Sequence, residues 1–436
     1  MWFAACIVCI AGTILAGVMS GAGGTAAILS AWAGRSPTTS AALTRSGVSP
    51  AARSDNLSAS SAAASSKTAS GAAAKDDFAA VWIATVSNIN FPSKQGLSAA
   101  AQKNEIDTIL DNAKKDGFRT VIVQMRPDCD ALYASSIYPW SAVLTGTEGK
   151  NPGYDPLQYF VEGAHRRGLK LEAWLNPYRI QGRADLSKLA ASSPARKHTD
   201  WTVKGNDGGL YFDPGLPEVR KLIEDGVMEI VKNYAVDGIV FDDYFYPEKN
   251  FADDASYKKY GAGQDRGDWR RENVDTLVKE IHDQIKSTGK NTVFGMCPFA
   301  VWANKSDNPA GSDTKAFESY YDQYADTRLW VQKGYIDYIC PQIYWKIGYS
   351  LADYAKVLDW WANTVKGTGV KLYVAHAVYR MDPASSGWGA GEIMNQLKLA
   401  AQYAEYDGSS FYGYAQVAQN TGGIADRLAA YYGAGG

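Results

Sequence analysis

From residue 78 onward the chain alternates short apolar runs with longer amphipathic stretches. Helical patterns begin at capping residues such as Ser98 and Asp155 and end at glycines such as Gly117. Eight apolar runs between them have the length and β-branched composition of buried strands: Val81–Ser87, Thr120–Met125, Lys170–Leu175, Gly238–Asp242, Thr292–Cys297, Tyr335–Ile343, Lys371–Val378 and Ser410–Tyr414. Eight β/α units with right-handed crossovers close into a barrel. We therefore predict the α/β class and a (β/α)8 TIM barrel over residues 77–436.

An open, doubly wound sheet is the alternative architecture for such an alternation. It would bind a dinucleotide through a glycine-rich turn after the first strand. The residues there, Val86–Asn90, read Val-Ser-Asn-Ile-Asn and contain no glycine. The sequence favours the barrel and gives no indication of a cofactor.

The N-terminal part of the chain has the composition of an export signal followed by a tether. Residues 1–34 carry no charge, contain an apolar run over 7–18, and include a small-x-small motif at 31–33. We predict a signal peptide or signal anchor over 1–34 and a disordered Ala/Ser-rich linker over 35–76. The barrel is then extracytoplasmic, either secreted or attached to the outer side of the cell membrane, with membrane contact only through the N-terminal segment.

Charge and cysteine usage narrow the classes of partner. The formal net charge of -2 gives no polybasic signature, so we expect no nucleic-acid partner. Aromatic residues make up 12% of the chain, a composition that suits a carbohydrate binder although most of them belong in a core. Three cysteines follow the linker, Cys129, Cys297 and Cys340, without metal-ligand spacing. We expect buried thiols and no metal site.

The fourth predicted strand ends in two adjacent carboxylates, Asp242 and Asp243, followed by Tyr244. In a parallel barrel the C-terminal strand ends carry the functional groups. Paired carboxylates there can transfer protons or stabilise positive charge in glycosidic bond cleavage. An acidic cap for the following segment is the structural alternative.

Amides, arginines and aromatic rings are predicted to gather at the same rim. No Ser-His-Asp order and no nucleophile elbow accompany them, whereas a hydroxyl-rich ligand needs such donors, acceptors and rings. We predict the following substrate-binding residues: Asn88, Arg126, Trp174, Asn176, Tyr178, Arg179, Tyr244, Gln342, Tyr344 and Trp345.

Four segments closely resemble the bacterial glycosyl-hydrolase-like ten family: Val81–Asn88, Ala173–Arg179, Phe241–Pro247 and Pro341–Trp345. The resemblance covers about residues 78–380. It implies an exported TIM-barrel glycosidase, and some members are similar to cell-division enzymes that cut peptidoglycan strands stripped of their peptides. Glu172 departs from the family, which usually has His before Ala-Trp.

Strand alternation separates the two carboxylates, because neighbouring residues of a strand point to opposite faces. Asp242 is our first choice for the catalytic acid, and Asp243 is expected to turn to a basic or amide partner. The fifth strand end, Gly295–Phe299, carries no second carboxylate. Either Asp128, Asp130 or Asp382 supplies it, or the N-acetyl group of the substrate is the nucleophile and Tyr344 holds it.

These features lead to one functional prediction and one alternative. We predict a glycoside hydrolase that cleaves a bacterial cell-wall or related aminosugar glycan by carboxylate acid/base catalysis at Asp242 and Asp243. The alternative is a non-catalytic extracellular glycan-binding protein on the same scaffold, in which the carboxylates are inert.

Overall fold

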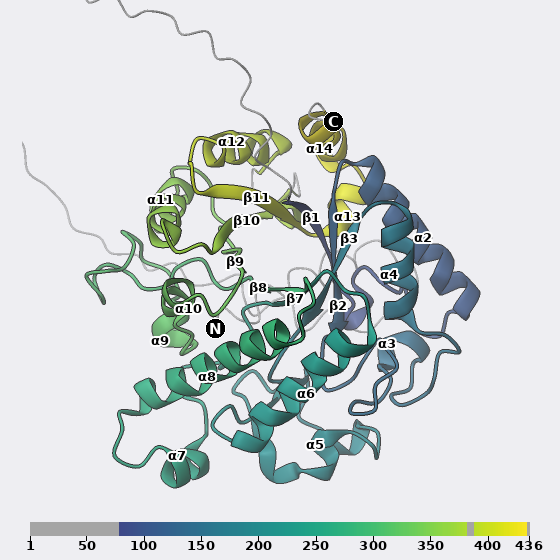
Figure 1. Ribbon diagram of the computed structural model, residues 1–436, viewed down its shortest axis with the longest axis vertical. Helices are drawn as coiled ribbons and strands as arrows, with labels where there is room; N and C mark the ends of the chain where they lie inside the picture. Colours follow the sequence, from purple (N-terminus) through teal and green to yellow (C-terminus); the bar gives the residue numbers. More distant parts are fainter. Residues whose placement is uncertain (1–77, 382–387, 434–436) are drawn as a thin grey trace, which may run out of the picture. The chain divides into compact units, whose positions relative to one another are not determined.

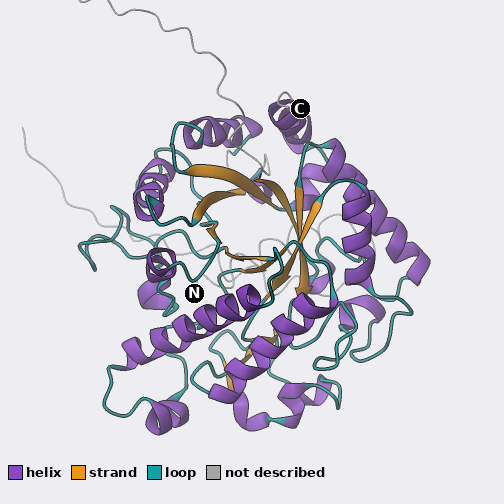
Figure 2. Ribbon diagram, in the orientation of Figure 1, coloured by secondary structure: helices purple, strands orange, loops and turns teal. Residues whose placement is uncertain are grey.

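The computed structural model describes residues 78–381 and 388–433, which form a closed barrel of parallel strands surrounded by helices (Figures 1 and 2). Around the barrel the strand order is β1-β11-β10-β9-β8-β7-β3-β2, each strand parallel to its neighbours. The strands are β1 Phe78–Ile83, β2 Thr120–Arg126, β3 Lys170–Leu175, β7 Gly238–Phe241, β8 Val293–Met296, β9 Tyr338–Ile339, β10 Lys371–Ala377 and β11 Tyr406–Tyr412. The predicted (β/α)8 barrel is confirmed.

Eight helices of the described residues alternate with the barrel strands and form the outer ring in Figure 1. They are α2 Ala99–Lys115, α4 Pro156–Arg166, α6 Pro217–Asn233, α8 Arg266–Ser287, α10 Thr327–Lys333, α11 Tyr354–Val365, α12 Ala390–Ala400 and α14 Ile424–Gly433. Short helices occupy the connections: α3 Ala142–Thr145, α5 Pro194–Lys197, α7 Asp254–Tyr260, α9 Ser319–Asp322 and α13 Tyr414–Ala418. The predicted caps are present, since Ser98 accepts a hydrogen bond from the amide of Ala101 and Asp155 from that of Gln158.

Of the eight predicted strands only the third has the predicted bounds, and the sixth, predicted over Tyr335–Ile343, is reduced to Tyr338–Ile339. The first and the last strand are shifted along the chain. β1 begins three residues earlier than predicted and ends at Ile83, because the chain turns into a short 3-10 segment, Val86–Asn88. Ser87 and Asn88 have φ values of 53° and 58°, which no strand contains. β11 likewise ends at Tyr412, and Tyr414 already begins helix α13.

A small antiparallel sheet inserted between β3 and α6 was not predicted. Its strands are β4 Arg179–Gln181, β5 Thr202–Lys204 and β6 Leu210–Phe212, in the order β4-β6-β5. Strands of three residues are too short for a periodic signal. The predicted signal segment 1–34 and linker 35–76 lie outside the described residues. Within the described part, no helix is long and apolar enough to cross a membrane.

Alternation along the strands divides the side chains into two packed layers. On β1, Ala79, Val81 and Ile83 face the helices and join the main hydrophobic core. Ala80 and Trp82 point the other way and join a smaller cluster inside the barrel. The barrel interior is therefore filled with side chains, and only its C-terminal end is open to a ligand.

Two glycines make room for the largest groups inside the barrel. The Tyr338 hydroxyl donates a hydrogen bond to buried Glu172, and burial raises the pKa of that carboxyl to about 7. A Cβ on Gly295 would lie 1.8 Å from Cζ of Tyr338, and one on Gly238 would lie 2.8 Å from Cγ of Glu172. The ring and the carboxyl thus occupy space that any larger residue would need.

Substitution of Gly295 tests this packing. We expect Gly295→Ala to lower the free energy of unfolding by about 1–3 kcal/mol, the usual cost of overpacking a core. Gly391 is the matched control, because it lies exposed in helix α12 and a Cβ added there would have no atom within 4 Å, so Gly391→Ala should stabilise by up to about 1 kcal/mol. Urea unfolding followed by circular dichroism measures both. Equal stability of Gly295→Ala and wild type would contradict this packing.

Candidate active site

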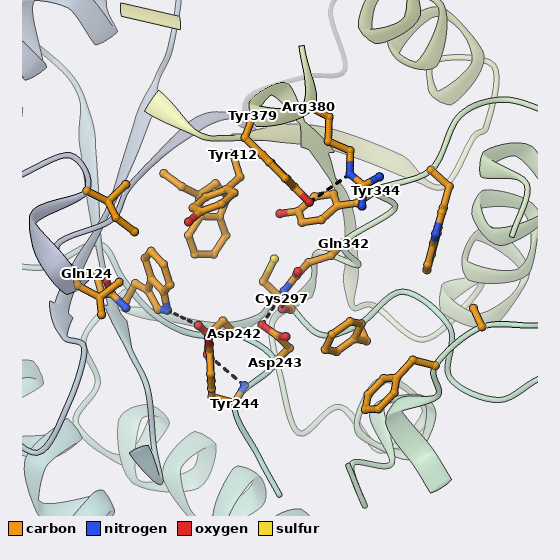
Figure 3. A pocket seen from close by; sticks show the side chains of 18 of the residues that line it. Gln124, Asp242, Asp243, Tyr244, Cys297, Gln342, Tyr344, Tyr379, Arg380 and Tyr412 are labelled. Carbon is orange, nitrogen blue, oxygen red and sulfur yellow. Dashed lines mark hydrogen bonds between the residues drawn. The ribbon is translucent and has the colours of Figure 1, made fainter. Parts of the chain in front are cut away.

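A cavity of about 430 Å³ opens at the C-terminal ends of the barrel strands (Figure 3). Every one of the eight strands, or the segment directly after it, contributes to the lining. The lining residues are Trp82, Val86, Ile89, Gln124, Trp174, Arg179, Asp242, Asp243, Tyr244, Cys297, Phe299, Lys315, Ala316, Phe317, Gln342, Tyr344, Trp345, Tyr349, Leu351, Tyr379, Arg380 and Tyr412. The volume lies in the range of ordinary small-molecule sites.

Both adjacent carboxylates line this cavity. Strand β7 ends at Phe241, so Asp242 and Asp243 follow the strand and are not bound by its alternation. Figure 3 shows the two side chains next to each other in the middle of the cavity wall. The described part of the lining contains no other carboxylate.

Asp242 is buried and held by three hydrogen-bond donors. Its Oδ2 accepts from Nε1 of Trp174 at 2.9 Å and from Nδ2 of Asn176 at 2.6 Å. Its Oδ1 accepts from the backbone amide of Tyr244 at 3.2 Å. Burial and the neighbouring charge of Asp243 raise the pKa of Asp242, whereas all three donors favour its ionised form.

A chain of amides determines how Asn176 faces Asp242. The Oε1 of Gln124 accepts from the backbone amides of Thr85 and Val86, each at 3.0 Å. The NH2 group of Gln124 therefore points to Oδ1 of Asn176, at 2.6 Å. Because the oxygen of Asn176 is already engaged, its NH2 group must face Asp242. The backbone amides after β1 thus determine that the NH2 group of Asn176, and not its oxygen, faces the Asp242 carboxylate.

Asp243 has a different environment. It is half-buried and accepts one side-chain hydrogen bond, from Nε2 of Gln342 at 3.0 Å. The same Gln342 nitrogen donates to the carbonyl of Cys297 at 2.8 Å, which anchors the amide between neighbouring strands. Burial raises the pKa of Asp243 to about 6, and the Gln342 amide acts in the opposite direction. The two carboxylates are adjacent in sequence but unequal in surroundings.

Six of the ten predicted substrate-binding residues line the cavity: Trp174, Arg179, Tyr244, Gln342, Tyr344 and Trp345. Arg179 is ion-paired with Asp128, with Nε to Oδ1 at 3.1 Å, and its guanidinium lies 5.6 Å from the ring centre of Tyr244. Asp128 therefore orients a cationic residue of the lining.

The other four predicted residues lie outside the lining. Asn88 donates to the carbonyls of Pro92 and Val143 and supports the loop after β1. Arg126 is buried, donates to the carbonyl of Pro177 and lies over a tyrosine ring. Tyr178 is buried in the main core. Asn176 is fully buried and reaches the site only through Asp242. Residues at strand ends point inward or outward according to local backbone geometry, which the sequence pattern does not show.

The candidates for a second carboxylate do not reach the described lining. Asp128 is engaged with Arg179, and Asp130 is buried with its pKa raised to about 8 by burial and by the charge of Asp128. Asp382 lies outside the described residues. Among those described, no group of three or more His, Cys, Asp or Glu residues could hold a metal ion, and the three cysteines are buried and unbridged.

Several lining residues are not among the site residues that the sequence predicts. Trp82 has the pattern of a core residue, and it is both buried and part of the lining. Tyr412 ends β11, and its position was hidden by the incorrect boundary of that strand. Residues 315–317 come from the long irregular connection after β8, for which no periodicity exists.

Comparison with known proteins assigns the family. The family described as glycosyl hydrolase-like 10 matches residues 77–387. The chain belongs to that family. It is 47% identical to the glycosyl hydrolase YngK of Bacillus subtilis over 365 residues, which cover 81% of this chain and 71% of the relative. It is 39% identical to the glycosyl hydrolase DigH of Escherichia coli over 356 residues, covering 76% and 81%. The predicted family and the glycoside hydrolase class are confirmed.

Solved structures show the same fold at low identity. The glycoside hydrolase domain of PgaB (BpsB) from Bordetella bronchiseptica superposes with a TM-score of 0.54 and 12% identity, over 80% of this chain and 97% of that one. An α-L-fucosidase from Paenibacillus thiaminolyticus gives 0.53 and 12%, over 82% and 49%. At 12% identity these similarities show a shared fold and do not assign an activity.

Asn176→Asp tests the role of the amide chain. The substitution keeps the shape of the side chain but sets an acceptor against Oδ2 of Asp242, so the pKa of Asp242 should rise further. We expect kcat on a glycan substrate to fall by about 10- to 100-fold, the value of a hydrogen bond to a charged group, with little change in KM. If the reaction needs ionised Asp242, the acidic limb of the pH profile should move to higher pH.

Asn363→Asp is the control, since it makes the same substitution at an exposed residue of α11 that does not line the cavity. Its kcat and KM should equal those of the wild type. An unchanged kcat in Asn176→Asp would show that the amide chain does not orient the carboxylate.

Proposed function

We propose that this glycoside hydrolase cleaves N-acetylated aminosugar strands of the bacterial cell wall and prefers strands without stem peptides. The observation that carries this proposal is the unequal pair of carboxylates in the cavity: Asp242 accepts hydrogen bonds from three donors, and the Asp243 side chain accepts one from a side chain. Family membership and the predicted export signal support the substrate class. Extracytoplasmic location is part of the proposal, because a cell-wall strand is reached only there.

We assign proton transfer to Asp243. A general acid must direct its proton to the glycosidic oxygen. Nε1 of Trp174, Nδ2 of Asn176 and the backbone amide of Tyr244 all donate to Asp242 and favour its ionised form, whereas Asp243 accepts only one side-chain hydrogen bond and lines the cavity. The proton of the pair therefore belongs on Asp243. Strand alternation favoured Asp242 as the acid. The proposal instead makes Asp243 the acid and leaves Asp242 to stabilise charge.

The acetamido group of the substrate is the proposed nucleophile. Its oxygen attacks C1 while Asp243 protonates the leaving oxygen, so the C1–O glycosidic bond breaks and a cyclic oxazolinium forms. Water then attacks C1 as the Asp243 carboxylate takes its proton, and the bond between C1 and the acetamido oxygen breaks, which restores the N-acetyl group. Oδ1 of Asp242 accepts only one hydrogen bond, which leaves a lone pair for the acetamido N–H. Tyr344 lines the same cavity and is placed to hold the acetamido group.

The predicted alternative was a non-catalytic glycan-binding protein. It requires the carboxylates to be inert, whereas the family and the relatives are glycosyl hydrolases by description. Reducing-end release from purified strands separates the two: a binding protein produces none.

Substitutions of the two carboxylates should have different substrate dependence. Asp243→Asn should lower kcat on glycan strands by about 100- to 10,000-fold, the usual contribution of general acid–base catalysis. The loss should be much smaller on a nitrophenyl glycoside, because that leaving group departs without protonation. Asp242→Asn should impair both substrates, since charge stabilisation is needed with either leaving group. The opposite pattern would restore Asp242 as the acid.

The pH profile tests the same assignment. A raised pKa of about 6 means that Asp243 loses its proton as the pH rises through that value, so kcat/KM should fall on the alkaline side. Gln342→Leu removes the donor that lowers this pKa, and the alkaline limb should then move to higher pH. An unmoved limb would indicate that another group supplies the proton.

Chemically deacetylated strands test the nucleophile and the substrate class. We expect mass spectrometry to show cleavage of acetylated, peptide-free strands and none of the deacetylated strands. Undiminished cleavage after deacetylation would exclude the acetamido mechanism. Comparable rates on plain glucan or xylan would exclude the aminosugar assignment.

A further inference from the structure

One side of the cavity is lined by apolar side chains, three of them half-buried and two exposed. We call Phe299, Phe317, Trp345, Tyr349 and Leu351, all from the connections after β8 and β9, the apolar shelf. The rings of Phe299 and Phe317 are 4.8 Å apart, while Tyr349 and Leu351 are 39% and 44% exposed. Apolar side chains that line an open cavity are typical of a ligand-binding site. The shelf offers flat contacts for a sugar unit next to the one being cleaved.

Lys315 lies beside this shelf and lines the same cavity. Its backbone amide donates to the carbonyl of Leu351 at 2.7 Å, which ties the two segments together at this point. Its side chain is exposed, and no ion pair of the described residues involves it. The nearest acidic side chain in sequence, Asp313, forms its ion pair with Lys356, and the charge of Lys315 only adds to the lowering of the Asp313 pKa. The ammonium group is thus available to a bound molecule.

The charges of the lining are unevenly distributed. Its carboxylates are the catalytic pair, and its cations are Arg179, Lys315 and Arg380. Arg179 is occupied by Asp128. Arg380 donates to the hydroxyl of Tyr379 at 3.2 Å and, in Figure 3, lies across the cavity from Gln124. A ligand that passes the acid pair therefore meets apolar surface accompanied by positive charge.

We propose that Lys315 is a specificity-determining residue that binds a carboxylate on the sugar unit over the apolar shelf. The inference rests on the proposed function and adds the physical basis on which the enzyme selects strands without stem peptides. Muramic acid without a stem peptide carries a lactyl ether that ends in a free carboxylate. Attachment of a peptide converts this carboxylate into a neutral amide and adds bulk. Lys315 then distinguishes the two strands by charge as well as by size.

Two substrates isolate the charge from the bulk. Peptide-free strands are used either as they are or after carbodiimide coupling with ammonia, which converts each lactyl carboxylate into a primary amide of nearly the same size. Wild type should show a KM about fivefold lower for the free-carboxylate strands, the size expected for a partly solvated ion pair. This difference should shrink as the salt concentration rises, because salt screens exposed charges.

Variants assign the effect to one residue. Lys315→Met, which keeps the length of the side chain, should remove the KM difference without changing kcat, and Lys315→Glu should reverse the preference. Lys305→Met is the matched control, an exposed lysine of the same connection that does not line the cavity, and it should behave as wild type. Because the Lys315 side chain is exposed, its substitution should not unfold the protein. Unfolding would also lower the activity on both substrates, whereas the expected change affects only one.

The outcomes separate the inference from the proposed function. Equal KM values of wild type for the two strands, or an equal rise for both in Lys315→Met, would overturn the inference and leave the aminosugar assignment in place. Failure of wild type to cleave either strand would overturn the proposed function and, with it, the inference. The inference would be established if wild type and Lys305→Met both have a lower KM for the free-carboxylate strands and Lys315→Met does not.

Discussion

The site depends on holding a buried carboxylate in water-poor surroundings. An ionised carboxylate in a protein interior is costly unless several donors replace its hydration. Trp174, Asn176 and the amide of Tyr244 supply those donors to Asp242. Their own positions depend on Gln124 and on the backbone after β1. The strand ends of β1, β2, β3 and β7 are therefore coupled through one polar network.

This network also explains why two neighbouring aspartates can have different roles. Asp242 is surrounded by donors and is suited to remain charged, while Asp243 has a single amide partner and faces the cavity. Unequal surroundings are a general way in which two carboxylates divide the roles of acid and charge stabiliser. The difference arises within one dipeptide because β7 ends at Phe241. Had the strand continued, alternation would have sent one carboxylate into the layer of helices.

The sequence predicted the barrel better than it predicted the site. Apolar runs and helix caps are local signals, and Ser98 and Asp155 cap helices as expected. Strand ends are less certain, because the positive φ values of Ser87 and Asn88 end β1 earlier than its apolar pattern suggests. The acid pair, the motif aromatics and Gln342 were found because each lies at the C-terminal end of a strand or in the segment after it. Asn88 and Tyr178 also follow strands, but their side chains turn into the loop and the core.

By itself the sequence determined the eight-unit barrel, the family and the rim at which chemistry can occur, because periodicity and motif are properties of neighbouring residues. Only the tertiary structure decided which oxygen of which aspartate is saturated, since those donors come from residues 66 and 68 positions away in the chain. It also brought Lys315 to Leu351 and built the apolar shelf from connections without periodicity. Such contacts form when the barrel closes and aligns strand ends that are distant in sequence.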